Sequence, residues 1–152
     1  DKMAQELAIK LSKSLKCVGL LAVEMLLHNE TILINEVAPR PHNSGHLSIE
    51  TCKTSQFQQH IRSVFNLKLG NTEHDGHAIM LNLVGDENYS GKVLYENLDT
   101  VFKIQNANLH IYGKNETRPN RKMGHITIIC NNFDEGYQSA KLLKSKIKIK
   151  SK

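Results

Sequence analysis

The chain has 152 residues, of which 39% are hydrophobic and 23% are charged, and its formal net charge is +5 at pH 7. This composition indicates a soluble globular protein, and the length suits one domain or two small ones. Glu24 interrupts the longest apolar run, residues 18–27, so no stretch approaches the roughly 18 to 20 residues of a membrane span. The three cysteines lack metal-ligand spacing and no export signal is visible, so we expect free thiols and a cytoplasmic protein.

Much of the positive charge lies in residues 141–152, where Lys alternates with Leu, Ile and Ser. Such a stretch is usually a solvated helix end or a frayed tail. Surfaces that bind nucleic acids normally place stacking aromatic residues among their basic ones, whereas aromatic residues make up 5% of this chain and tryptophan is absent. The composition therefore argues against a nucleic acid as the partner.

The first half of the chain predicts a helix, a hairpin and a second helix. Apolar residues at spacings of three and four predict an amphipathic helix over residues 1–16. Two β-type runs, residues 18–25 and 31–37, flank the polar sequence His28-Asn29-Glu30 and predict a β-hairpin. The prolines and glycine of residues 38–46 predict an ordered loop, and a helix capped by Ser48 or Thr51 is expected before residue 66.

The second half of the chain is richer in β-type runs. The sequence becomes polar and contains glycine at residues 67–75, and we place a domain boundary there, giving domains 1–66 and 67–152. Short β-type runs follow at residues 77–84, 107–112 and 124–130, and a last helix is expected from residue 134 to about residue 146. The pattern predicts an α+β protein with a small β-rich second domain.

Two acidic side chains of the predicted hairpin could face each other. A register centred on Glu30 would place Glu24 opposite Glu36, with both side chains on one face. Two such carboxylates would repel each other unless a cation lay between them. Mg²⁺ prefers hard oxygen ligands, and the side-chain oxygen of Asn35 could join the set. The alternative is that Glu24 lies on a solvated face, and spacing alone favours this alternative.

The loop after the hairpin concentrates polar side chains behind two prolines that stiffen the backbone. Arg40 could bind an oxyanion through two parallel hydrogen bonds, while His42 and Asn43 donate hydrogen bonds that orient it and stabilise its charge. In the alternative interpretation, Asn43 and Ser44 cap the backbone and His46 is simply buried. The residues alone support the two interpretations about equally.

A second cluster of cations lies between two predicted β runs, in residues 112–125. Lys114 and Arg121, brought together by a turn at Pro119-Asn120, could hold a phosphate. The alternative, a solvated hairpin tip, is the commoner meaning of such a run. The sequence contains no glycine-rich phosphate loop, nucleophile elbow or zinc motif.

Three motifs, in this order, resemble those of 5-(carboxyamino)imidazole ribonucleotide synthase, an ATP-grasp ligase family of purine biosynthesis. They are Glu24-Met25 followed by Asn35-Glu36-Val37-Ala38-Pro39-Arg40-Pro41-His42-Asn43-Ser44-Gly45-His46, then Thr54-Ser55-Gln56-Phe57-Gln58-Gln59-His60-Ile61-Arg62, and finally Tyr112-Gly113-Lys114 with Arg118-Pro119-Asn120-Arg121-Lys122-Met123-Gly124-His125. Together they span most of the chain, which makes the resemblance far more specific than any one motif.

The resemblance implies the C-terminal part of an ATP-grasp domain followed by a small β-rich domain of barrel-sandwich or single-hybrid type. It implies ATP-dependent carboxylation of 5-aminoimidazole ribonucleotide by bicarbonate through carboxyphosphate, with ATP and Mg²⁺ as cofactors, in a cytoplasmic homodimer. It also assigns three sets of site residues: Glu24, Asn35 and Glu36 for Mg²⁺ and the ATP phosphates, Arg40, His42 and Asn43 for bicarbonate, and Lys114 and Arg121 for the ribonucleotide phosphate.

Two departures from the family pattern matter. The family's N-terminal domain, central subdomain and nucleotide-clamping strands precede the region matched here, so we expect a fragment that does not turn over alone. Asn120 stands where the family usually has Gly, and because Asn tolerates a left-handed conformation the turn can form. The closest rivals in mechanism are another ATP-grasp carboxylase and the formate-dependent purine transformylase. The motifs in residues 40–46 and 114–125 argue against both assignments. The rival of a different class is a small basic module that binds nucleic acid or acidic partners.

Overall fold

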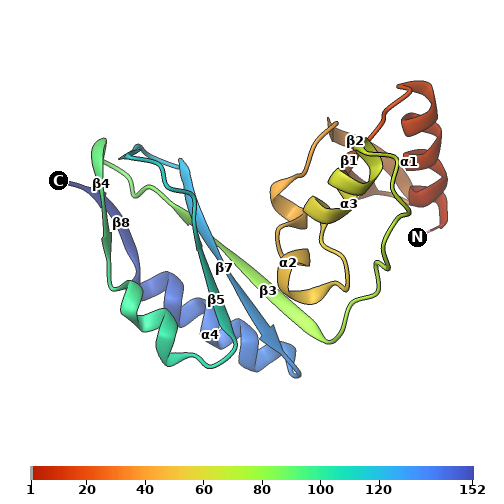
Figure 1. Ribbon diagram of the computed structural model, residues 1–152. Coiled ribbons are helices and arrows are strands. Elements are labelled where there is room, and N and C mark those ends of the chain that lie inside the picture. Colours follow the sequence, from red (N-terminus) through yellow and green to blue (C-terminus); the bar gives the residue numbers. More distant parts are fainter. Residues whose placement is uncertain (1) are drawn as a thin grey trace. The chain divides into compact units, whose positions relative to one another are not determined.

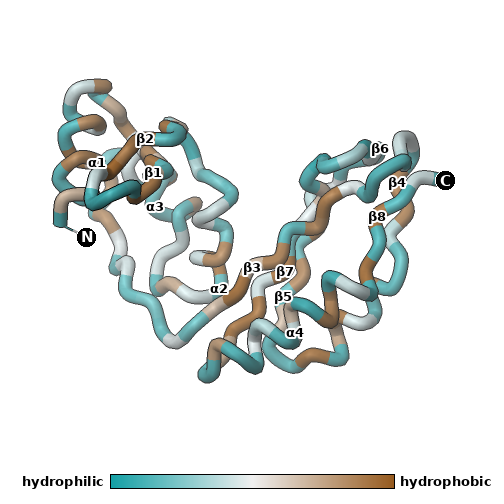
Figure 2. Tube along the Cα trace, turned by 180° about the vertical axis from the view of Figure 1, so that it is seen from behind, coloured by the Kyte–Doolittle hydropathy of each residue, from teal (hydrophilic) through white to brown (hydrophobic). Residues whose placement is uncertain are grey.

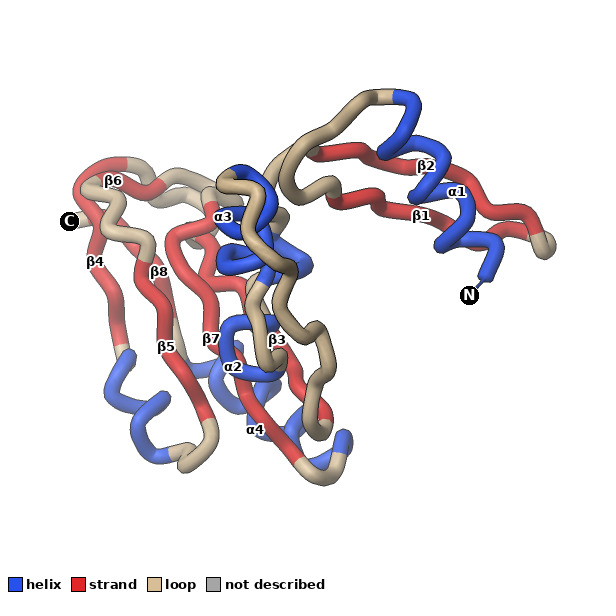
Figure 3. The backbone as a smooth tube through the Cα atoms, turned by 45° about the vertical axis from the view of Figure 1, so that its right-hand side comes forward, coloured by secondary structure: helices blue, strands red, loops and turns tan. Residues whose placement is uncertain are grey.

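The computed structural model describes residues 2–152 (Figure 1). The chain divides into two compact units, and the first ends at His74 while the second begins at Asp75. Both units combine helices with antiparallel strands (Figure 3), which confirms the predicted α+β class. None of the helices in residues 2–152 is long and apolar enough to cross a membrane.

The first unit contains a helix, a two-stranded hairpin and three short helical segments. In chain order they are α1 (Lys2–Ser14), β1 (Ala22–His28), β2 (Thr31–Ala38), η1 (Asn43–Gly45), α2 (Ser48–Thr51) and α3 (Gln56–Val64). The single helix expected here is two, because Ser55 caps α3 in a capping box with Gln58. The expectation of a cap at Ser48 or Thr51 for that helix is therefore wrong.

Residues 67–74 belong to the first unit, because their main chain is hydrogen-bonded to Gln59 and Lys53. Gln59 Nε2 donates to the Gly70 carbonyl at 2.8 Å, and Gln59 Oε1 accepts from the Gly70 N–H at 2.9 Å. The Lys53 N–H donates to the Glu73 carbonyl at 2.9 Å. These contacts explain why the structure divides after His74. The domain ranges 1–66 and 67–152 stay a prediction.

The second unit contains two three-stranded antiparallel sheets. The first has the order β3-β7-β5, from β3 (His77–Val84), β7 (Lys122–Cys130) and β5 (Ala107–Ile111). The second has the order β6-β4-β8, from β6 (Glu116–Thr117), β4 (Gly91–Glu96) and β8 (Lys148–Ser151). A 3-10 helix, η2 (Leu98–Lys103), follows β4, and α4 (Phe133–Lys146) packs against β3 and β7.

The apolar core of the described residues lies in this second unit. Figure 2 shows hydrophobic stretches along β3 and β7. The buried cluster consists of Leu83, Val101, Met123, Ile126, Ile128, Ala140, Leu143, Ile147 and Ile149. The buried side chains described in the first unit are polar except for Ala38. Hydrophobic burial therefore stabilises chiefly the second unit.

The lysine-rich C-terminus is partly a helix end, as one of the two alternatives expected, because residues 141–146 close α4. Residues 148–151 form the ordered strand β8, so the expectation of a frayed tail is wrong for them. β8 pairs antiparallel with β4, and Ile149 lies opposite Tyr95. Ile147 and Ile149 are buried while the alternating lysines are partly exposed, as the two-residue period of a strand requires. Lys150 Nζ lies 2.9 Å from Glu96 Oε2, and this hydrogen bond raises the pKa of Lys150.

Candidate functional site

The hairpin of the first unit turns on two residues, Asn29 and Glu30. Their φ angles are 44° and 63°, and His28 on β1 pairs with Thr31 on β2. Positive φ at both central residues is the requirement of a type I′ turn, whose twist matches that of the flanking strands. The turn therefore sets the register of the strand ends nearest to it.

A β-bulge changes that register before the acidic residues are reached. Regular pairing from the turn would place Glu24 opposite Asn35. The register shifts between Glu24 and Met25, so that Met25 pairs with Ile34 while Glu24 pairs with Glu36. Asn35 is the extra residue of the bulge. The expected pairing of Glu24 with Glu36 is confirmed, but the bulge produces it and not a turn centred on Glu30.

The bulge brings the three candidate metal ligands together with the imidazole of His42. Asn35 Nδ2 donates to Glu24 Oε2 at 3.3 Å. His42 Nδ1 lies 3.5 Å from Glu24 Oε1, and His42 Nε2 lies 3.8 Å from Glu36 Oε1. Two carboxylates and one imidazole leave this cluster with negative charge in either protonation state of the ring. The oxygen donors and the excess negative charge fit a hard divalent cation.

Of the other loop residues, Ser44 contacts the His42 ring directly. His42 Nδ1 lies 2.9 Å from Ser44 Oγ and also accepts from the Ser44 N–H, so His42 caps the short helix η1 that begins at Asn43. Arg40 is exposed, and its Nη1 donates to the Pro41 carbonyl at 3.1 Å. The backbone cap of this loop is therefore His42, and not Asn43 or Ser44 as the alternative interpretation expected.

Sequence reasoning missed Gln56, which the structure places against this loop. Its side chain is buried and contacts the main chain of His42 and the ring of His46. His46 also stacks on Phe57, with ring centroids 5.3 Å apart. The capping box of Ser55 and Gln58 places Gln56 in the first turn of α3, but only the fold puts that turn beside the loop, so the sequence carries no signal for its role.

The second basic loop is built on a type II turn. The Arg121 N–H donates to the Arg118 carbonyl at 3.0 Å, with Pro119 and Asn120 in the central positions. Asn120 has a φ of 61°, which confirms the expected left-handed conformation. The Asn120 N–H donates to the Gly85 carbonyl at 2.9 Å and so ties the turn to the end of β3.

Each candidate phosphate-binding cation reaches a main-chain carbonyl across this loop. Lys114 Nζ donates to the Lys122 carbonyl at 2.6 Å, and Arg121 Nη1 donates to the Glu116 carbonyl at 3.0 Å. Lys114 also lines an open pocket of about 620 Å³, and Arg121 is not among the lining residues. Tyr95 lines the same pocket, and burial raises the pKa of its hydroxyl.

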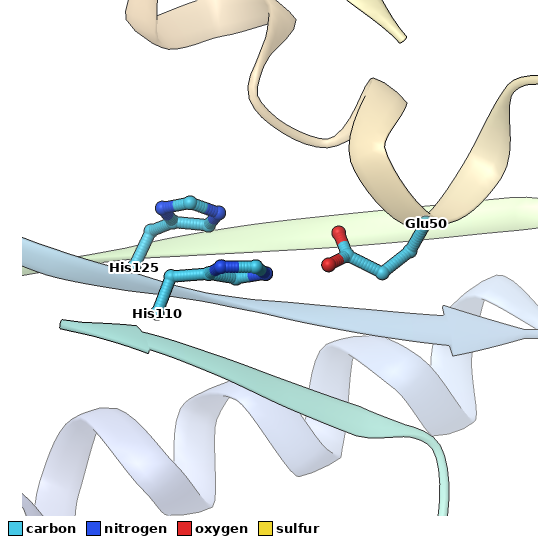
Figure 4. Close-up of side chains that lie close together, drawn as sticks. All are labelled: Glu50, His110 and His125. Atoms are coloured by element: carbon cyan, nitrogen blue, oxygen red, sulfur yellow. The ribbon is translucent and has the colours of Figure 1, made fainter. Parts of the chain in front are cut away.

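A buried histidine supports the base of the loop. His125 on β7 pairs with His110 on β5, and their rings stack with centroids 4.4 Å apart, one over the other (Figure 4). His125 Nδ1 lies 2.9 Å from the Tyr112 hydroxyl, and Lys114 Nζ lies 5.6 Å from the centroid of the Tyr112 ring. The two ends of the loop are therefore joined through side chains beneath Lys114.

Two family models match most of the chain. The ATP-grasp domain model covers residues 1–57, and the phosphoribosylaminoimidazole carboxylase C-terminal domain model covers residues 78–139. The N5-carboxyaminoimidazole ribonucleotide synthase of Bacillus subtilis is 48% identical over 139 residues, which are 91% of this chain and 35% of the relative. The phosphoribosylaminoimidazole carboxylase of Schizosaccharomyces pombe is 45% identical in an alignment 144 residues long, which covers 89% of this chain and 25% of the relative. The chain thus spans about a third or less of the length of these relatives.

Solved structures agree with these sequence matches. The N5-carboxyaminoimidazole ribonucleotide synthetase of Thermotoga maritima superposes with a TM-score of 0.92 at 46% identity, over 99% of this chain and 42% of that one. The Aspergillus clavatus synthase in complex with ADP and 5-aminoimidazole ribonucleotide superposes with a TM-score of 0.81 at 34% identity, over 95% of this chain and 39% of that one. The chain therefore belongs to the N5-carboxyaminoimidazole ribonucleotide synthase family of ATP-grasp proteins.

Proposed function

We propose that the protein containing this chain is an ATP-dependent ligase that carboxylates 5-aminoimidazole ribonucleotide with bicarbonate, in purine biosynthesis. The observation that carries the proposal is the cluster of Glu24, Glu36 and His42, which lies within the family's loop motif. Solved relatives from Aspergillus clavatus contain ATP, or ADP with 5-aminoimidazole ribonucleotide, and these ligands support the choice of substrates.

Glu24 and Glu36, with the amide oxygen of Asn35, would hold Mg²⁺ against the nucleotide phosphates. When bound, the ion offsets negative charge on the transferring phosphoryl group. Without the bulge at Asn35, regular pairing would place Asn35 opposite Glu24, and Glu36 would lie on the other face of the hairpin. With the bulge, Glu36 lies opposite Glu24. Asn35 donates to Glu24 at present and would turn its amide to offer oxygen.

Arg40, His42 and Asn43 would bind bicarbonate beside this cluster. The hydrogen bond to the Pro41 carbonyl uses one of the five donors of Arg40, and its planar fork suits a carboxylate-like anion. His42, fixed at the start of η1, would orient the bicarbonate oxygen that attacks the γ-phosphorus of ATP. The bond from the γ-phosphorus to ADP breaks as carboxyphosphate forms. Carboxyphosphate then releases CO₂ and inorganic phosphate, and the exocyclic amine of the ribonucleotide adds to the CO₂ carbon and loses a proton.

Lys114 and Arg121 would bind the phosphate of the ribonucleotide. Their cationic groups donate to carbonyls of the same loop, at Lys122 and Glu116, and these hydrogen bonds keep both side chains close to the loop backbone. A phosphate is a stronger acceptor than a carbonyl because it is charged, so it can recruit the remaining donors of both side chains. The buried stack of His125 and His110 gives the loop a rigid base.

We further propose a cytoplasmic homodimer that acts on small molecules, without nucleic-acid or membrane partners. Cys17, Cys52 and Cys130 are free thiols, which supports a reducing compartment. The homodimer rests on the family resemblance. The basic-module alternative is disfavoured because the lysine-rich segment that motivated it forms β8 in the second sheet.

The test is ADP release by the full-length protein that contains residues 1–152, with and without the ribonucleotide and bicarbonate. We expect hydrolysis that both substrates stimulate, that Glu36→Gln abolishes, and that Lys114→Ala weakens by raising the KM for the ribonucleotide. Lys103→Ala is the control, because Lys103 is exposed and pairs with Asp99 on η2. Hydrolysis that ignores the ribonucleotide, or that survives in Glu36→Gln, would contradict the proposal.

A further inference from the structure

The side chain of Gln56 makes three polar contacts with the loop that contains His42 and His46. Gln56 Oε1 accepts from the His42 N–H at 3.0 Å, and Gln56 Nε2 donates to the His42 carbonyl at 2.8 Å. Gln56 Nε2 also lies 2.8 Å from His46 Nδ1. The amide thus pairs with the main chain of His42 on both sides, as a neighbouring β-strand would.

These contacts fix both the orientation of the amide and the tautomer of His46. Oxygen must face the His42 N–H and nitrogen must face the His42 carbonyl, because the reverse placement would oppose donor to donor and acceptor to acceptor. An amide nitrogen donates and does not accept, so His46 Nδ1 accepts the second N–H of Gln56. The proton of a neutral His46 therefore lies on Nε2.

Gln56 is itself held from two further sides. The Gln56 main-chain N–H donates to Ser48 Oγ at 2.9 Å, and Ser48 Oγ donates to the Gly45 carbonyl at 2.5 Å. A Cβ atom at Gly45 would lie 2.5 Å from Gln56 Oε1, so the amide packs directly on the glycine. The side chain is 8% exposed, and these neighbours leave it little room to move.

We propose that Gln56 is a positioning residue for the bicarbonate loop, a role that rests on the proposed function for its kinetic consequences. Its amide fixes the backbone of His42, and this backbone carries the imidazole that lies between Glu24 and Glu36. Its second N–H sets the tautomer of His46. The amide group is required, because an isosteric carboxylate would offer acceptors where two donors are needed.

Gln56→Glu changes this chemistry while keeping the shape of the side chain. The introduced carboxylate would face the His42 carbonyl with no hydrogen between the two oxygens, and it would draw the proton of His46 to Nδ1. The first effect would displace the main chain of His42, and the second would exchange the donor and acceptor nitrogens of the His46 ring. We expect the kcat/KM for bicarbonate to fall about 10- to 100-fold, the range for residues that orient ligand-binding groups, with the KM for the ribonucleotide unchanged.

Gln59 offers a matched control on the same helix. It is 9% exposed, and its amide pairs with both main-chain groups of Gly70 in the same two-sided way. Gln59→Glu therefore introduces the same unfavourable carboxylate into an equally buried amide site, whose two hydrogen bonds go to Gly70 and not to His42 or His46. A purely structural loss would affect both variants equally.

The first measurement is the histidine side-chain ¹⁵N spectrum of the full-length protein that contains residues 1–152, which distinguishes the two tautomers. We expect the Nε2–H form of His46 in wild type and in Gln59→Glu, and the Nδ1–H form in Gln56→Glu. The second is steady-state kinetics of the full-length protein, varying bicarbonate. Gly45→Ala is a second variant, since its methyl group would push the unchanged amide away from His42, and it should also lower the kcat/KM for bicarbonate.

Three results would overturn the inference. They are the Nδ1–H tautomer in the wild type, wild-type bicarbonate kinetics in Gln56→Glu, and an equal kinetic loss in Gln59→Glu. If the wild-type protein shows no ADP release that depends on bicarbonate and the ribonucleotide, the proposed function fails separately. In that case the ¹⁵N spectra of wild type, Gln56→Glu and Gln59→Glu still decide whether Gln56 organises the loop.

Discussion

Glu24 lies directly opposite Glu36 because Asn35 forms a bulge between the hairpin turn and the acidic pair. A shift of one residue in a strand register reverses the face of every side chain beyond it. The bulge shifts the register only beyond Asn35. The pairs near the turn stay regular, while Glu24 and Glu36 come to lie opposite each other on one face of the hairpin. The geometry of the candidate metal site therefore depends on one extra residue of backbone.

The turn that precedes the bulge is strained at Glu30, and we expect Glu30→Gly to stabilise the hairpin. A left-handed residue with a Cβ costs about 1 kcal/mol, and Gly is favoured at the second central position of a type I′ turn. Amide hydrogen exchange in β1 and β2 should slow accordingly. Glu30→Ala removes the same carboxylate but keeps the Cβ, so an equal gain in that variant would attribute the effect to charge.

The turn and the bulge illustrate what could be predicted from the sequence. The hairpin and the left-handed Asn120 follow from short-range rules, and the structure confirms both. The bulge at Asn35 could not be predicted, because nothing in the local sequence distinguishes it from a regular strand residue. Glu24 pairs with Glu36 as expected, but the turn lies on Asn29 and Glu30 and is not centred on Glu30 alone.

Long-range pairing explains the other differences. The strands β4, β6 and β8 were not predicted, since each is short and acquires its pairing from segments distant in sequence. The isoleucines at 147 and 149 alternate with lysines, a pattern that a solvated tail and a half-buried strand share. Gln56 was missed because a glutamine at a helix start has no special meaning until the loop beside it is placed.

The paired carboxylates predict a stabilisation by Mg²⁺ that depends on Glu36. A ligand that binds only the folded state raises its stability in proportion to RT ln(1 + [L]/Kd), so MgCl₂ should raise the melting temperature of wild type. Glu36→Gln should lose most of this shift. Without Mg²⁺ the same variant should be as stable as wild type or slightly more stable, because it relieves the repulsion from Glu24.

NaCl at matched ionic strength is the control for this experiment, since it screens the two carboxylates without bridging them. An equal response to MgCl₂ in wild type and Glu36→Gln would show that the pair does not hold the ion. The thermal measurement needs no turnover, so it tests the metal site independently of the ligase activity.

The turn at Pro119-Asn120 predicts different effects for two small substitutions. Asn120→Gly keeps the left-handed conformation at no steric cost, whereas Asn120→Ala should lose about 1 kcal/mol of unfolding free energy. The same Ala substitution should raise the KM for the ribonucleotide, because Arg121 follows directly in the turn. Steady-state kinetics of the two variants checks this, and a normal KM in Asn120→Ala would separate the turn from the phosphate site.

The core of the second unit can be tested with two adjacent leucines of α4. Leu143 is 0% exposed and Leu142 is 50% exposed, so the pair differs in burial but not in residue type or helix position. Leu143→Ala should lower the unfolding free energy by about 2 to 5 kcal/mol through lost burial and a cavity, whereas Leu142→Ala should change it by about 0.5 kcal/mol or less.

Tyrosine fluorescence can follow this unfolding without interference from the first unit. The chain has four tyrosines and no tryptophan, and all four lie in the second unit, at Tyr89, Tyr95, Tyr112 and Tyr137. A urea titration read by tyrosine emission therefore reports on the unit that contains the apolar core. Equal losses in the two leucine variants would mean that α4 contributes to stability through its surface and not through the buried face that contacts β3 and β7.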